Sequence, residues 1–340
     1  MIRGSSYKSI KGMCVLSINF YSQSDGDVPM RCTEMLRVVF ALTIFVCGSL
    51  LGMAMPAGAL QARTQVVMLG TGNPNPTPDQ SGPATAIVVD QQVYLIDAGP
   101  GIVRRVEAAR LKGIEPFNAN SLNKVFLTHL HSDHTLGLPD LMFSPWVSGR
   151  TESISVYGPP GTKRMTNHLE EAWSEDIYMR LFGLEPRSST EGYKASTHEI
   201  EGPGLIYSDE LVRVYAIPVV HGSWPAAYGY KFETPDRVIV ISGDAAPSPI
   251  LFEACDGCDV LIHEVYSPVG LESRPPEWQR YHRSYHTSTV ELAEMAQKSN
   301  PKLLVLYHQL LWGVPDNLTD EIEASGYFGR VVSARDLDIF

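Results

Sequence analysis

The chain has 340 residues, of which 44% are hydrophobic, and a formal net charge of −11. This length supports one large or two small domains, and the composition is that of an ordinary globular protein with enough apolar residues for a large core. Anionic polymers such as RNA usually meet a basic surface, so the acidic balance counts against nucleic acid as a partner.

The N-terminal part of the chain contains an apolar stretch that is typical of a secretory signal peptide. Residues 36–55 are apolar, Arg31 and Arg37 precede or open the stretch, and small residues end it at Ala59. We therefore predict a signal peptide at 35–59 that is cleaved after Ala59, with an uncleaved membrane anchor as the alternative.

Residues 1–34 are polar and without a pattern, which indicates a mis-assigned or disordered leader, and Met30 or Met35 would be a more usual start. The mature protein would then be one domain at 60–340. Export implies a periplasmic or secreted location and, once the signal peptide is removed, no stable contact with a membrane.

Beyond residue 59 the chain holds two cysteines, Cys255 and Cys258, in a C-x-x-C spacing. In an oxidising compartment this pair could form a local disulfide, and otherwise it would be two inert thiols. A single C-x-x-C is weak evidence for zinc, which usually needs a second pair.

Apolar runs and helical periodicity predict strands and helices in alternation. The expected strands are 64–69, a hairpin of 85–89 and 93–96, and several between 205 and 241. The expected helices are 102–111, 161–182 and 291–298, the last capped by Ser288 or Thr289. This pattern alone predicts a mixed α and β protein.

The densest group of chemically active side chains is the sequence His129-Leu130-His131-Ser132-Asp133-His134, which follows the apolar run 125–127. Imidazole suits zinc and similar metals, and a carboxylate suits harder ions or a shared site. Neighbouring residues in a turn point in different directions, so these four side chains cannot easily surround one ion. Two metals side by side are therefore expected.

This motif resembles the signature of the metallo-β-lactamase superfamily, and later residues match it in order. His221, Asp244 and His308 each follow an apolar run, and Asp97 matches an early aspartate that supports a ligand. The resemblance covers roughly residues 65–335. It implies an α+β fold, a four-layer αβ/βα sandwich of two sheets with helices outside.

The resemblance also implies a ligand set for two divalent ions, expected to be Zn²⁺, with Mn²⁺ or Fe as alternatives. Asp133 counts both as a ligand and as a catalytic residue. The first ion would be held by His129, His131 and His221, the second by Asp133, His134 and His308, with Asp244 as the bridge.

A second pair of residues resembles the ribonuclease Z branch of the family. Glu264 would hold His286, and His286 would protonate the leaving oxygen. The alternative is that His286 only helps to cap the following helix. The chain departs from that branch in lacking a basic arm: residues 183–210 hold two basic and six acidic side chains.

Three features flank this pair without a settled role. The block of Arg280, His282 and Arg283 could bind an anionic substrate or form a solvated loop. Trp224 and Trp312 follow expected ligands, and each could line a substrate pocket or pack beneath its loop.

We therefore expect an exported dinuclear metal hydrolase that acts on small anionic esters, phosphodiesters or aryl sulfates, through metal-bound hydroxide. The alternatives are a ribonuclease Z-type endonuclease that processes transfer-RNA 3′ ends, a lactonase-like hydrolase, and a non-catalytic metal-binding scaffold. The chain is also compatible with a homodimer.

Overall fold

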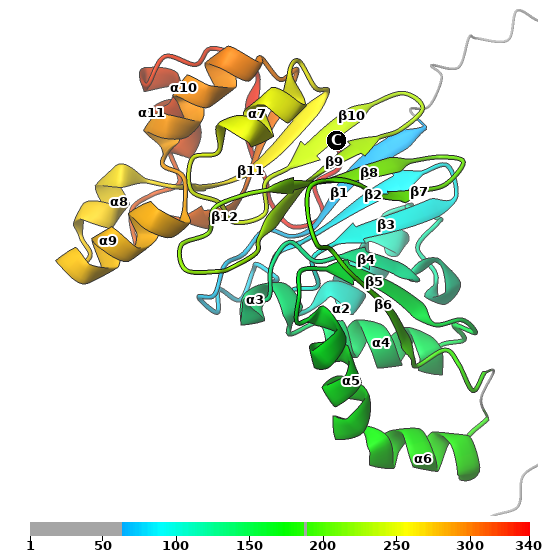
Figure 1. Ribbon diagram of the computed structural model, residues 1–340. Helices are drawn as coiled ribbons and strands as arrows, with labels where there is room; N and C mark the ends of the chain where they lie inside the picture. The colour runs from blue at the N-terminus through cyan, green and yellow to red at the C-terminus, as the bar shows by residue number, and fades with distance from the viewer. Residues whose placement is uncertain (1–62, 187–188) are drawn as a thin grey trace, which may run out of the picture. The chain divides into compact units, whose positions relative to one another are not determined.

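The computed structural model describes residues 63–186 and 189–340, which belong to one unit of the chain (Figure 1). The predicted leader and signal peptide lie outside the described residues. The strands are β1 (Thr64–Gly70), β2 (Ala84–Val89), β3 (Gln92–Ile96), β4 (Lys124–Phe126), β5 (Ile154–Gly158), β6 (Ala195–Glu199), β7 (Gly204–Ser208), β8 (Arg213–Pro218), β9 (Tyr228–Glu233), β10 (Val238–Ile241), β11 (Val260–Tyr266), β12 (Leu304–Leu310) and β13 (Val331–Ser333).

Helices connect or follow most of these strands. They are α2 (Ile102–Leu111), the short 3₁₀ helix η1 (Ala119–Ser121), α3 (Ser132–Thr135), α4 (Leu138–Val147), α5 (Thr162–Ala172), α6 (Ser174–Phe182), α7 (Pro249–Cys255), α8 (Pro268–Glu272), α9 (Pro276–Tyr285), α10 (Thr289–Ser299) and α11 (Leu318–Ala324). Ser288 caps α10 in a capping box with Glu291, as the sequence predicts.

The strands form two sheets. One sheet has the order β1-β2-β3-β4-β5-β6, and the other has the order β13-β12-β11-β10-β9-β8-β7. The first sheet opens with antiparallel pairs and is parallel from β3 to β6. The second is antiparallel from β7 to β10 and parallel from β10 to β13.

Three apolar clusters show that the two sheets and their helices form four layers. Side chains alternate between the faces of a strand, and in β2 Ala86 joins one cluster whereas Ile87 joins another. The first cluster joins the β1–β6 sheet to α2 and α4, and the second fills the space between the sheets. The third joins the other sheet to α7, α10 and α11 (Figure 1). The predicted four-layer sandwich is confirmed.

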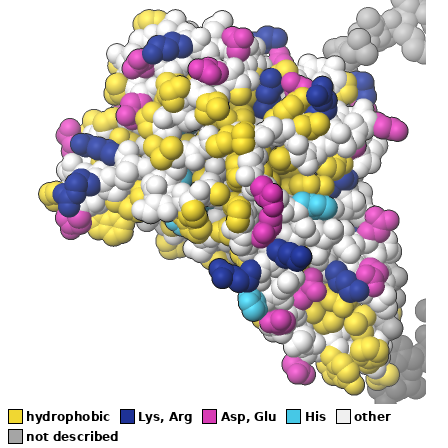
Figure 2. All heavy atoms as spheres, in the orientation of Figure 1, with side chains coloured by type: hydrophobic (Ala, Val, Ile, Leu, Met, Phe, Trp, Pro, Cys, Tyr) yellow, Lys and Arg dark blue, Asp and Glu magenta, His cyan; other side chains and the backbone are white. Residues whose placement is uncertain are grey.

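The single helix expected at 161–182 is instead two helices, α5 and α6, so this detail of the prediction is wrong. The chain leaves the helical conformation at Trp173, whose ring stacks on Phe143 of α4 with centroids 5.4 Å apart. Beyond this break, α6 buries Ile177 but exposes Tyr178 and Phe182, and apolar side chains gather over α6 in Figure 2.

Cys255 and Cys258 form a disulfide at the end of α7. This agrees with the first of the two expectations for the C-x-x-C pair. Within residues 63–186 and 189–340, no helix is both long and apolar enough to span a bilayer.

Candidate metal centre and active site

The expected ligands meet at one edge of the two sheets because the strands that carry them run in the same direction. β3 and β4 are parallel, and they lead into Asp97 and the segment 129–134. β8 and β10 are both antiparallel to β9, so they also share a direction, and β11 and β12 are parallel to β10. Strands that share a direction end at the same edge, where ligand sites of α/β proteins usually form.

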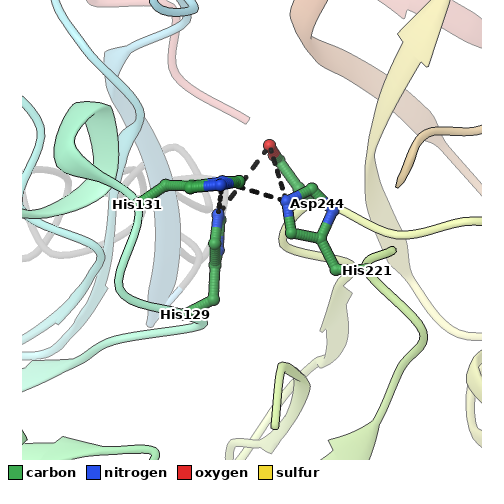
Figure 3. A group of neighbouring side chains, drawn as sticks. All are labelled: His129, His131, His221 and Asp244. Carbon is green, nitrogen blue, oxygen red and sulfur yellow. Dashed lines mark hydrogen bonds and ion pairs between the residues drawn. The ribbon is translucent and has the colours of Figure 1, made fainter. Parts of the chain in front are cut away.

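Four of these residues form a first group, with their side chains directed toward one another (Figure 3). Nδ1 of His131 lies 3.0 Å from Nε2 of His129 and 3.0 Å from Nε2 of His221. Oδ2 of Asp244 lies 4.0 Å from both of those Nε2 atoms. Three imidazole nitrogens and one carboxylate oxygen thus surround a common point.

A second group lies on the other side of Asp244. Nε2 of His308 lies 3.3 Å from a carboxylate oxygen of Asp133 and 3.3 Å from one of Asp244. Nε2 of His134 lies 3.5 Å from Asp133 and 3.3 Å from Oδ1 of Asp244. Because Asp244 contacts residues of both groups, it has the position that a bridging ligand requires.

Buried hydrogen bonds orient these imidazoles. Nδ1 of His134 lies 2.8 Å from Asp97, whose carboxylate also accepts from the amide and hydroxyl of Thr128. Nδ1 of His221 donates to the carbonyl of Tyr285 at 2.8 Å. Each bond holds its ring at Nδ1 and directs Nε2 toward the group, as in metal sites whose histidines are oriented by a second hydrogen bond.

A β-bulge in β12 also orients one of the ligand-type side chains. In β12, His308 is an extra residue relative to β11, because Glu264 pairs with Tyr307 and Val265 pairs with Gln309. Such a bulge re-aims a side chain, and His308 has a φ of +45°, which non-glycine residues rarely adopt.

The turn before Asp244 needs a glycine. Gly243 has a φ of +62°, and a Cβ there would lie 2.7 Å from Cβ of Thr128. Strand β10 can therefore approach the 128–134 turn closely enough for Asp244 to reach both groups.

The pKa shifts of the buried side chains differ in direction from one residue of the site to the next. Burial lowers the pKa of His221 to about 3 and that of His129 well below its usual value, which favours neutral imidazoles. Burial alone would lower the pKa of His134. The nearby carboxylates, Asp244 first, outweigh burial and raise the pKa of His134 well above its usual value. Burial alone would raise the pKa of Asp244, but the surrounding imidazoles, His308 first, lower it well below its usual value.

The residues present fit divalent metal ions. Nε2 of His134 and Oδ1 of Asp244 are buried, 3.3 Å apart and without a hydrogen-bond partner among the described residues. Unpartnered buried polar atoms are costly, and a shared cation would satisfy both. Nitrogen and carboxylate donors in this ratio suit zinc and similar ions.

Glu264 and His286 lie beside this cluster. Oε2 of Glu264 is 3.3 Å from Nδ1 of His286, while its Oε1 accepts from the amide of Thr287. Nδ1 of His286 is also 4.0 Å from Asp244. Burial raises the pKa of Glu264 well above its usual value and lowers the pKa of His286 to about 4. Although His286 precedes α10, Ser288 provides the cap of that helix.

A cavity of about 370 Å³ opens onto the cluster, and some of its residues carried no recognisable motif in the sequence. Arg274, Trp278 and Tyr281 of the α8–α9 region line it together with Asp133, Asp244, His286 and His308. The spacing of Trp278 and His282, one helical turn apart, is the signal that could have indicated a shared face.

The structure shows the positions of the residues for which the sequence allowed two alternative roles. His282 and Trp312 line the cavity, whereas Arg280 and Arg283 are exposed. Trp224 packs on His131 and donates from Nε1 to Nε2 of that ring at 2.8 Å.

A buried cluster of imidazoles and carboxylates at the edge of a four-layer αβ/βα sandwich defines a metal-dependent hydrolase. Residues 92–309 match the family described as "Beta-lactamase superfamily domain". Ribonuclease Z of Mycobacterium sp. (strain KMS) is 31% identical over 248 residues, which cover 72% of this chain and 84% of the relative. The chain therefore belongs to the metallo-β-lactamase superfamily, in its ribonuclease Z branch.

Solved structures support the same fold. The metallo-β-lactamase fold protein YhfI from Bacillus subtilis aligns with a TM-score of 0.61 and 18% identity, covering 82% of this chain and 99% of that one. Human tRNase Z, short form, aligns with a TM-score of 0.58 and 21% identity, covering 81% and 98%.

These relatives correct the sequence-based expectation about partners. Net charge counted against nucleic acid, but relatives that share most of this chain are named ribonucleases, so that expectation is wrong. Net charge sums the whole surface, whereas a substrate meets the charge around the site. Here Arg274 lines the cavity, and Arg280 and Arg283 are exposed on the adjacent α9.

Proposed function

We propose that this protein is a phosphodiesterase of the ribonuclease Z type, which hydrolyses a phosphodiester bond in RNA. The observation that carries this proposal is the Glu264–His286 pair, 3.3 Å apart and directly beside the ligand cluster. Hydrolysis of an RNA phosphodiester releases an alkoxide, which is a poor leaving group. A proton donor at this position would stabilise the alkoxide as it departs.

The metals would be held by the two groups described above, with Asp244 between them. Two divalent ions would supply Lewis acidity to the phosphoryl group and lower the pKa of a bound water. We propose Zn²⁺ at both positions, because imidazole nitrogens outnumber carboxylates among the donors. Elemental analysis of the loaded protein should return two zinc ions per chain, and a single ion would contradict the dinuclear proposal.

The chain's own residues would supply the proton that the leaving group needs. Nδ1 of His286 faces Glu264, so Nε2, on the opposite side of the ring, is left to face the cavity that His286 lines. As the bond between phosphorus and the leaving oxygen breaks, Nε2 delivers a proton to that oxygen. Glu264, with Oε2 3.3 Å from Nδ1, restricts the orientation of the ring.

The test is cleavage of a precursor transfer RNA by metal-loaded protein, analysed by the length and end groups of the products. The expected result is one discrete cut that disappears when the metal is chelated. A precursor left intact while other esters are hydrolysed would overturn the ribonuclease proposal.

A second candidate is hydrolysis of small aryl esters, phosphodiesters or aryl sulfates. The cavity favours it, because Trp278, Tyr281 and Trp312 give it aromatic walls that suit an aryl group. The same protein should then hydrolyse p-nitrophenyl sulfate or bis(p-nitrophenyl) phosphate faster than it cleaves RNA. The reverse order excludes this candidate.

We also propose that the protein is exported, on the evidence of the Arg-flanked apolar stretch that ends at Ala59. N-terminal sequencing of the periplasmic or secreted protein should begin near Leu60. Soluble cytoplasmic protein that retains residues 1–59 would contradict export.

A further inference from the structure

The segment from α8 to α9 brings an arginine to the cavity. Arg274 lies between the two helices and lines the cavity beside Asp133 and Asp244. Its buried Nε has no hydrogen-bond partner among the described residues. The side-chain amide of Gln279 donates to the Arg274 carbonyl at 2.9 Å and so holds this backbone in place.

Aromatic rings line the same cavity as Arg274. His282, which is 9% exposed, stacks near Trp278 with centroids 5.9 Å apart and planes 29° apart, and it lies 4.6 Å from Trp312. Its Nδ1 is buried and without a partner among the residues described, although the side chain lines the cavity. Trp278 is 46% exposed, a large area for a tryptophan at a cavity wall.

This subsite is next to the reacting centre. His282 is one helical turn before His286, and their ring centroids are 5.5 Å apart. A group held by Arg274, His282 and Trp278 would therefore be the part of the substrate adjoining the scissile bond.

We propose that Arg274, Trp278, His282 and Trp312 form a subsite for the nucleotide adjacent to the scissile phosphate. The base stacks against the tryptophans, and the next phosphate along the strand pairs with Arg274. Every base has a flat aromatic face and every nucleotide a phosphate, so the subsite recognises RNA without selecting a sequence. This inference rests on the proposed function, because it assigns the substrate of the same site.

Binding to the metal-loaded protein, measured by calorimetry, tests the subsite without turnover. The probes are adenosine 3′,5′-bisphosphate, which carries a phosphate on each side of the nucleoside, adenosine 5′-monophosphate, and ribose 5-phosphate, which lacks the base. R274Q should weaken the bisphosphate roughly tenfold but leave the monophosphate within about twofold, since only the second phosphate needs the arginine. W278A should weaken both adenosine nucleotides roughly tenfold and spare ribose 5-phosphate.

Two matched variants serve as controls. R330Q removes an exposed arginine that directly precedes β13, and W173A removes a partly exposed tryptophan at the start of α6. Neither should change the affinity of any probe.

The outcomes separate the two proposals. Equal affinities of the three probes, or no effect of R274Q and W278A, would overturn the subsite even if RNA is cleaved. Binding that follows the expected pattern in a protein that leaves RNA intact would retain the subsite and reject the ribonuclease activity.

Discussion

Glu264 and His286 lie beside the ligand cluster, with Oε2 of Glu264 3.3 Å from Nδ1 of His286. We predict that His286→Ala keeps the metal content and lowers turnover of RNA by roughly 10²–10⁴-fold, the usual contribution of a general acid. The loss should shrink for a nitrophenyl ester, whose leaving group is a stable anion and needs no proton. Kinetics with both substrates, alongside metal analysis, check this.

Glu264→Gln should give a smaller defect than His286→Ala. A glutamine at this position can still contact Nδ1 of His286 but cannot exchange a proton with it, so the defect should have the same substrate dependence and be smaller. His286 also lies within reach of Asp244 and His308, in a group that could itself hold an ion. If His286→Ala releases a metal ion, His286 is a ligand and its assignment to the leaving group is wrong.

Arg150 shows how one side chain can join several elements. It is 1% exposed and donates to the carbonyls of Leu122, Leu141, Met142 and Gly192, which lie around β4, α4 and β6. We predict that Arg150→Met lowers the free energy of unfolding by about 3 kcal/mol or more, because it leaves several buried carbonyls unpaired. Chemical denaturation measures this. Arg164→Met, at an exposed position of α5, should change stability little, and an equal loss in both variants would contradict the role of Arg150.

Helix α6 has a sharp division between one buried side chain and an exposed apolar surface. Ile177 is 8% exposed and joins the cluster beneath the β1–β6 sheet, whereas Phe182 is 70% exposed. We predict that Ile177→Ala lowers the free energy of unfolding by about 2–3 kcal/mol, and that Phe182→Ala changes it by less than about 0.5 kcal/mol. Thermal or urea denaturation distinguishes the two, and similar losses would show that α6 packs differently.

The ligand cluster can be predicted from the sequence more fully than the residues that surround it. His221, Asp244 and His308 each follow or end an apolar strand, and strand direction alone then brings them to one edge. Arg274 and Trp278 could not be found in this way, because their place depends on how α8 and α9 fold over the cavity. The break at Trp173 was missed for a similar reason, since stacking on Phe143 is a tertiary contact.

The metal cluster also joins the two sheets. His129, His131, Asp133 and His134 follow β4 of one sheet, whereas His221, Asp244 and His308 belong to the other. An ion bound across that boundary stabilises the folded state alone, by about 2.7 kcal/mol when its free concentration is a hundred times the dissociation constant. Removing metal with a chelator should therefore lower the melting temperature, and adding zinc should restore it. Asp244→Ala, which removes the residue shared by both groups, should weaken both ions together and abolish most of this difference. An unchanged melting temperature after complete metal removal would show that the two sheets hold together without the ions.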